Sequence, residues 1–296
     1  MPLLPQVVAL ALLQATPALS PDALVADVRT LSAAPDNDAR FEALTALLKS
    51  HNLTFTVEMF TLDKQPAREP RTRGRNVIVS MGDGPDEIVV GAHYDAVRLM
   101  DGTLSRGAVD NGASSVMLVH AAEALRGQRL PTRVTFVWFD FEESGLLGSA
   151  KYLEAHASDR IKAMLNYDIN GYGDTVVFGP PMGGSDARLT RLLLETCAAE
   201  AIDCVRFNGM PSGDDRSFGR AKIPTLSIAI LPATEVHQLW LMLHANGAGL
   251  APGFQPPIFH TIHTPDDVPD RLDAAGMATT QRLAVALVRR LSEMRP

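Results

Sequence analysis

Five residues with metal-binding side chains stand in a regular relation to the apolar segments of the chain. They are His93, Asp110, Glu143, Asp168 and His263. Three of them lie at the ends of strand-like runs, which read EIVVGAH, TRVTFVWFDFEE and AMLNYD. Ligands of open α/β sheets gather at the carboxyl ends of the strands, so we expect these side chains to meet at one edge. Imidazole and carboxylate without thiolate suit zinc, manganese or cobalt at a hydrolytic centre, whereas structural zinc sites favour cysteine.

The residues beside these candidates have spacings that suit supporting roles. Asp95 lies two residues after His93, so on an extended chain both side chains leave the same face. Its carboxylate is then expected to accept the free imidazole N–H and to fix the tautomer of His93. Glu142 and Glu143 are adjacent, so their side chains diverge as the strand ends. One can bind a metal ion while the other acts as a general base on a water molecule.

Asp110 stands at the start of the helix-like segment VDNGASSVMLVHAAEAL, whose first turn carries small residues. A carboxylate in that position can direct its two oxygens to two different cations. Two-metal sites with ions roughly 3.5–4 Å apart need such a bridge. We therefore expect two divalent ions.

Each of these residues also has a simpler interpretation. A single His-x-Asp is more often a packed histidine, and adjacent glutamates are usually a solvated pair. Asp110 and Asp168 could cap a helix or a turn, because Asp-Asn-Gly is strong turn chemistry. His260 is an alternative to His263 as the ligand. The coincidence of all five residues in one ordered pattern favours the metal site over these separate explanations.

The hydrophobic periodicity alternates between strands and helices and predicts an α/β fold with three layers, α/β/α, around a mixed, mostly parallel sheet. The metal site is expected at the carboxyl ends of its strands. Ser20 and either Asn37 or Asp38 are the expected caps of the first two helices. Predicted helices cover 20–32, 36–52, 109–125, 145–156, 186–200 and 273–293, and predicted strands cover 54–62, 75–82, 87–93, 132–139, 163–168 and 225–231.

A length of 296 residues fits one domain, expected over 21–296, better than several. The net charge of −7 argues against nucleic acid as a partner. Residues 1–20 are apolar and end in small residues, which predicts a signal peptide and a secreted or periplasmic protein. If that segment were instead a retained helix, the protein would be cytoplasmic. No later run is long enough for a membrane span.

The two cysteines, Cys197 and Cys204, could form a disulfide in an exported protein or remain as two packed thiols.

The chain lacks the sequence motifs of several other catalytic chemistries. It contains no G-x-S-x-G elbow, no H-E-x-x-H, no C-x-x-C and no P-loop.

From about residue 76 to the end, the chain resembles the zinc aminopeptidases of the bacterial leucyl aminopeptidase and aminopeptidase Y type, a family that also contains glutaminyl cyclases. The resemblance rests on GAHYDAV, AVDNGASSVML, FDFEESGLLGSAKYL, LNYDING and HTPDDVPDRLD. It implies a zinc-peptidase domain that hydrolyses the N-terminal peptide bond of peptides with a free amino terminus, through a water between two zinc ions. The implied roles are His93 and Asp168 for one ion, Glu143 and His263 for the other, Asp110 as the bridge, Glu142 as general base and Asp95 as the residue that orients His93.

The chain departs from the family pattern at one element. The family usually has Ser-Asp-His before a late strand, but the corresponding stretch here is SGDDRSF, with Asp215 in the place of the histidine. Met210 stands near the point where some members have a tyrosine. Two alternatives to the aminopeptidase remain, a glutaminyl cyclase that acts on N-terminal Gln and a non-catalytic binding domain of the same fold. The sequence does not indicate an oligomeric state.

Overall fold

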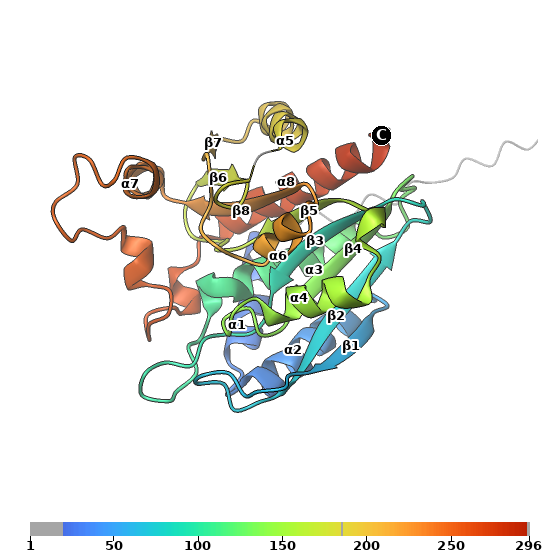
Figure 1. The fold of residues 1–296 in the computed structure, drawn as a ribbon, viewed down its shortest axis with the longest axis horizontal. Coiled ribbons are helices and arrows are strands. Elements are labelled where there is room, and N and C mark those ends of the chain that lie inside the picture. Colours follow the sequence, from blue (N-terminus) through green and yellow to red (C-terminus); the bar gives the residue numbers. More distant parts are fainter. Residues whose placement is uncertain (1–19, 185, 295–296) are drawn as a thin grey trace, which may run out of the picture.

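Eight strands form a single sheet in the computed structural model, which describes residues 20–184 and 186–294 (Figure 1). The strand order is β1-β2-β4-β3-β5-β8-β6-β7. Four of the seven pairings between these strands are parallel, and the other three are antiparallel. The strands are β1 (Thr56–Thr61), β2 (Arg73–Met81), β3 (Glu87–His93), β4 (Arg133–Phe139), β5 (Ile161–Tyr167), β6 (Thr175–Gly179), β7 (Cys204–Arg206) and β8 (Thr225–Leu231).

Helices cover both faces of the sheet and complete the three predicted layers (Figure 1). One face carries α1, α2, α3, α5 and α8, which pack on one another, while α4 and α6 pack together on the opposite face. The helices are α1 (Pro21–Ser32), α2 (Asn37–Ser50), α3 (Ala113–Leu125), α4 (Leu147–Ala155), α5 (Ala187–Glu200), α6 (Asp215–Arg220), α7 (Ala233–His244) and α8 (Ala274–Glu293). Shorter helical turns are η1 (Ala108–Gly112), η2 (Ser158–Arg160), η3 (Pro257–His260) and η4 (Pro269–Arg271).

The apolar runs of the sequence form the centre of the sheet. β3, β4, β5 and β8 are buried along almost their whole length, because helices cover them on both faces. Such strands have continuous apolar runs, whereas the edge strand β1 alternates between exposed and partly buried positions. The larger core, under α1, α2, α3 and α8, contains Val28, Leu44, Met117, Trp138 and Leu287. The opposite face contains Val137, Phe139, Tyr152, Met164 and Phe218.

The structure confirms the α/β architecture and differs from the sequence predictions in several local features. Asp36 caps α2 by accepting the N–H of Ala39, instead of Asn37 or Asp38, and the side chain of Ser20 caps nothing. The short elements β6, β7, α6 and α7 were not predicted, because they lack a long periodic pattern. The predicted signal peptide lies outside the described residues, apart from Ser20.

A disulfide joins Cys197 near the end of α5 to Cys204 at the start of β7. This settles the choice that the sequence left open between a disulfide and two thiols.

None of the described helices combines the length and the apolar character that a bilayer crossing requires.

Gly276 marks a close approach between the first turn of α8 and the loop after β5. A Cβ atom built at Gly276 would overlap the carbonyl oxygen of Gly173. Helix propensity alone predicts that Gly276→Ala stabilises the protein by about 1 kcal/mol. We expect the overlap to reverse the sign and to lower the free energy of unfolding by about 1–3 kcal/mol, measured by urea denaturation. Ala275→Gly at the exposed neighbour should cost no more than about 1 kcal/mol, and a more stable Gly276→Ala protein would contradict the packing argument.

Candidate metal centre

The carboxyl ends of three adjacent parallel strands bring the first candidate residues together. His93 is the last residue of β3 and pairs with Phe139, the last residue of β4. Asp168 follows β5 directly, and Glu142 and Glu143 lie in the loop that leaves β4. The parallel register therefore places these residues at one edge of the sheet, as the sequence predicted.

Asp110 lies between the two histidines and contacts each with a different oxygen. Its Oδ1 is 3.2 Å from Nε2 of His93, and its Oδ2 is 3.1 Å from Nε2 of His263. Glu143 lies beside His263, with 3.0 Å between Oε2 and Nε2. Asp168 lies beside His93, with 3.6 Å between Oδ1 and Nε2. The five candidates therefore form two groups, which Asp110 joins.

Glu142 faces the His93 side of this arrangement. Its Oε2 is 4.0 Å from Nε2 of His93, and its carboxylate also lies near that of Asp168. The adjacent Glu143 faces the His263 side, so the two glutamates diverge as expected from their spacing. The alternative ligand His260 is exposed and is not among the residues that converge on Asp110.

The backbone around Asp110 differs from the predicted helix start. Asp110 has φ −114° and ψ 89° and lies in η1, whereas the regular helix α3 begins at Ala113. Asp267 accepts hydrogen bonds from the N–H groups of Val109 (2.6 Å) and Asp110 (3.2 Å). A carboxylate from a distant loop thereby fixes the turn. The sequence analysis did not assign this role to Asp267, which lies four residues after His263.

Asp95 is close to His93, but its carboxylate has a different main contact from the one expected. The Nδ1 of His93 donates to the backbone carbonyl of Asp95 at 3.1 Å, and the carboxylate is 3.6 Å away. The carboxylate oxygens accept the N–H groups of Glu142 at 3.1 Å and Glu143 at 3.2 Å. Asp95 therefore positions the loop of both glutamates and, through its carbonyl, the ring of His93.

Three residues with positive φ lie at or beside the candidates. Phe141 (φ 58°) precedes Glu142, Ile169 (φ 57°) follows Asp168, and His263 itself has φ 58°. Residues other than glycine rarely adopt this conformation, which costs of order 1–3 kcal/mol when the surrounding structure imposes it. Such strain clusters at functional sites, and here it reorients the chain where each strand or loop delivers its side chain.

Four carboxylates surround the two imidazoles and control their charge. Burial opposes a charge on His93, but Glu142, Asp110 and Asp168 raise its pKa well above the usual value. Asp110 and Glu143, which accept hydrogen bonds from His263, raise its pKa to about 11. Burial and the neighbouring Asp110 raise the pKa of Glu143 to about 7. The carboxylates thus require compensating positive charge, which a divalent cation supplies more effectively than a proton.

The donor atoms fit metal ions in two further respects. Among the described residues, Glu143 Oε1 and Asp168 Oδ1 are buried and accept no hydrogen bond. Ligand atoms about 2.0–2.1 Å from a tetrahedral ion lie roughly 3.3 Å from one another, and the contacts of 3.0–3.6 Å around Asp110 and His263 match this spacing. The residues present are therefore suited to hold divalent ions such as zinc.

A cavity of about 480 Å³ opens onto these residues. Asp110, Glu142, Glu143, Asp168 and His263 form its polar end. Its remaining lining is largely apolar and includes Val177, Met210, Leu239, Ile258, Phe259 and Ile262. The loop-rich span 244–262 contributes Ile258, Phe259 and Ile262 to this wall.

The element that departs from the family pattern also lies near this site. Asp214 and Asp215 are buried, and Asp215 begins α6. Burial, together with the nearby Asp168, raises the pKa of Asp215 to about 7. Burial also raises the pKa of Asp214, which His93 opposes. Met210 lines the cavity, so a thioether takes the position where some relatives are expected to have a phenol.

Known proteins resemble the chain in sequence and in fold. A "Probable leucine aminopeptidase" of Arthroderma otae is 29% identical over 222 residues, which cover 69% of this chain and 54% of that protein. The chain thus spans about half the length of the curated relatives it matches. A zinc aminopeptidase from Bacillus subtilis has the same fold, with a TM-score of 0.73 at 14% identity over 92% of this chain and 95% of that one. A glutaminyl cyclase from Porphyromonas gingivalis has a TM-score of 0.72 at 18% identity over 93% and 98%.

The sequence also matches a known family over most of its length. Residues 76–288 match peptidase family M28, and this segment contains all seven candidate site residues. The chain belongs to peptidase family M28.

Proposed function

We propose that the protein is an aminopeptidase that binds two zinc ions and hydrolyses the first peptide bond of peptides with a free amino terminus. The observation that carries the proposal is the position of Asp110, whose two oxygens face two different histidines. His93 and Asp168 would hold one ion, and Glu143 and His263 would hold the other. The match to peptidase family M28 supports the hydrolytic chemistry.

When bound, the ions would polarise the carbonyl of the scissile bond and lower the pKa of a water molecule in the cavity. Glu142 is the residue assigned to move the proton. Burial raises its pKa well above the usual value of a glutamate, which suits a group that accepts a proton from water and returns it to the leaving amine. Asp95 holds this carboxylate in place through the N–H of Glu142.

The cavity supports a free amino terminus and an apolar first side chain as substrate features. Its polar end is rich in carboxylates, which attract the ammonium group of a peptide and fix its distance from the attacked carbonyl. Its apolar lining, with Val177, Leu239 and Ile258, offers a hydrophobic surface for the first side chain.

Export from the cytoplasm is part of the same proposal. The apolar segment 1–20 supports a signal peptide. The disulfide between Cys197 and Cys204 supports an oxidising compartment, because such bonds persist in secreted and periplasmic proteins.

The first prediction concerns the number of ions. Asp110→Ala removes the oxygen atoms shared by both groups, so we expect the zinc content of purified protein to fall by more than one ion per chain. His93→Ala should remove mainly one ion, because His263 and Glu143 remain. Elemental analysis after dialysis measures both. Asp101→Ala, at an exposed aspartate outside the centre, is the matched control and should keep the wild-type content. Equal zinc in Asp110→Ala and wild type would contradict the bridge.

The second prediction separates the adjacent glutamates. Glu142→Gln keeps the side-chain shape but cannot accept a proton, so kcat should fall by about two to four orders of magnitude with little change in zinc content. Glu143→Gln should lower the zinc content instead. If Glu142→Gln emptied the site and Glu143→Gln left it full, the two roles would be exchanged.

The third prediction separates the aminopeptidase from a glutaminyl cyclase and from a binding domain. A peptide with N-terminal Gln should lose a whole residue, which mass spectrometry detects, and its N-acetylated form should not react. Acetylation removes both the charge and the donor of the amino terminus. Loss of ammonia alone, above the spontaneous rate, would indicate the cyclase. Unchanged peptides with varied amino termini, tested with zinc-loaded protein, would indicate a non-catalytic member.

A further inference from the structure

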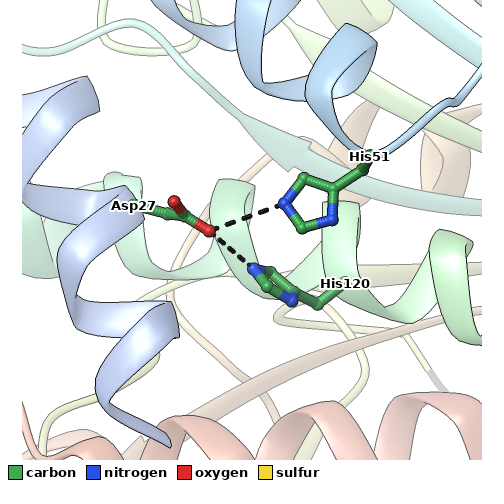
Figure 2. Close-up of side chains that lie close together, drawn as sticks. All are labelled: Asp27, His51 and His120. Atoms are coloured by element: carbon green, nitrogen blue, oxygen red, sulfur yellow. Dashed lines mark hydrogen bonds and ion pairs between the residues drawn. The ribbon is translucent and has the colours of Figure 1, made fainter. Parts of the chain in front are cut away.

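A second group of metal-binding side chains lies where three helices meet, apart from the residues around Asp110. Asp27 comes from α1, His51 follows the end of α2, and His120 lies in α3 (Figure 2). Oδ2 of Asp27 is 2.8 Å from Nε2 of His120 and 3.6 Å from Nε2 of His51. The two imidazole rings lie edge to face, with 4.5 Å between their centroids, so both direct a nitrogen toward the same carboxylate.

Glu123 orients one of these rings. Its Oε2 lies 2.7 Å from Nδ1 of His51, whereas the other ring nitrogen, Nε2, faces Asp27. A hydrogen bond from Nδ1–H to this carboxylate leaves the lone pair of Nε2 directed at Asp27. Metal-binding histidines are usually fixed in this way by a carboxylate on the other ring nitrogen.

The spacing of the three donor atoms is close to what a tetrahedral ion requires. The three atoms lie within 4.8 Å of one another. A zinc ion with bonds of about 2.0–2.1 Å separates its ligand atoms by roughly 3.3 Å. The separation between Asp27 and His51 is near this value, and that between Asp27 and His120 needs to open by about half an ångström. Because the side chains of Asp27 and His51 are 27% and 17% exposed, a small adjustment is feasible and a water molecule can reach the fourth position.

The arginine beside this group already has partners. Arg126 is 3.9 Å from Oε1 of Glu123 and donates to the backbone carbonyls of His51 and Asn52. Asp27 and Glu123 thus face two imidazoles and one arginine that already has several partners. Two imidazoles with one carboxylate favour zinc among the common divalent ions.

We infer that Asp27, His51 and His120 form a further zinc site, with Glu123 as the carboxylate that orients His51. The ion would tie α1 and the end of α2 to α3. α1 also supports the turn that carries Asp110, because Val28 and Ser32 lie against Gly112. Occupancy of the site should therefore stabilise the helical layer behind the candidate metal centre.

Zinc stoichiometry of the full-length protein tests this inference. His51→Ala and Asp27→Asn should each bind one zinc ion fewer per chain than the wild type. His156→Ala is the matched control. His156 forms an ion pair with one carboxylate, Glu58 at 2.7 Å, whereas the carboxylate of Asp27 pairs with two imidazoles. It should keep the wild-type stoichiometry. Equal zinc content in the wild type and in both site variants would overturn the site and leave only a hydrogen-bonded pair.

Thermal unfolding separates this site from the centre around Asp110. In an Asp110→Ala background, added zinc should raise Tm by a few degrees, because an ion that binds only the folded state stabilises it. The double variant Asp110→Ala with His51→Ala should lose most of that shift. An equal shift in both proteins would overturn the inference, whether or not the centre around Asp110 binds zinc.

Discussion

The carboxylate of Asp110 between two imidazoles is the contact on which the candidate metal centre depends. His93 comes from the sheet, whereas His263 comes from a loop near the C-terminal helix, and among the described residues Asp110 forms ion pairs with both rings. Without the Asp110 carboxylate, no shared ligand would connect the group of His93 and Asp168 with the group of Glu143 and His263. This explains why the turn around Asp110 is held so firmly, with Asp267 accepting two of its N–H groups.

Electrostatic balance is the second constraint, and it connects the ligands with the residues that position them. Four buried or half-buried carboxylates meet two imidazoles, and the raised pKa values of His93, His263 and Glu143 mean that bound protons balance the carboxylates when no cation is present. Such an arrangement is unfavourable for folding alone, because burying charged groups is costly. Metal binding would remove that cost, so the stability of this edge of the sheet should depend on its ions.

The helical layer behind the sheet provides the mechanical support for this edge. Arg40 of α2 is buried and donates to the carbonyls of Tyr94, Arg106 and Gly107, which connects α2 with the loop before Asp110. α1 lies against the same turn. The cluster of Asp27, His51 and His120 joins these helices to α3. Its occupancy would therefore bear on the centre indirectly, through the packing of the helices.

The sequence by itself determined six of the eight described strands, the class of fold and the five metal-ligand candidates. β3 was predicted to the residue, and β4 and β5 to within two, because buried parallel strands form continuous apolar runs that end at polar residues. Those same ends placed His93, Glu143 and Asp168 together. The match to the family over residues 76–288 agrees with this interpretation.

Only the tertiary structure decided how these residues contact one another. The non-helical backbone at Asp110, the use of the Asp95 carboxylate by the N–H groups of Glu142 and Glu143, and the role of Asp267 all depend on contacts between distant segments. The cluster of Asp27, His51 and His120 depends on helix packing in the same way, and the disulfide depends on the turn that brings Cys204 of β7 back to Cys197 of α5. Local periodicity indicates which side of a helix or strand is buried, but it does not indicate which other element packs against that side. That element is determined only when the whole chain folds.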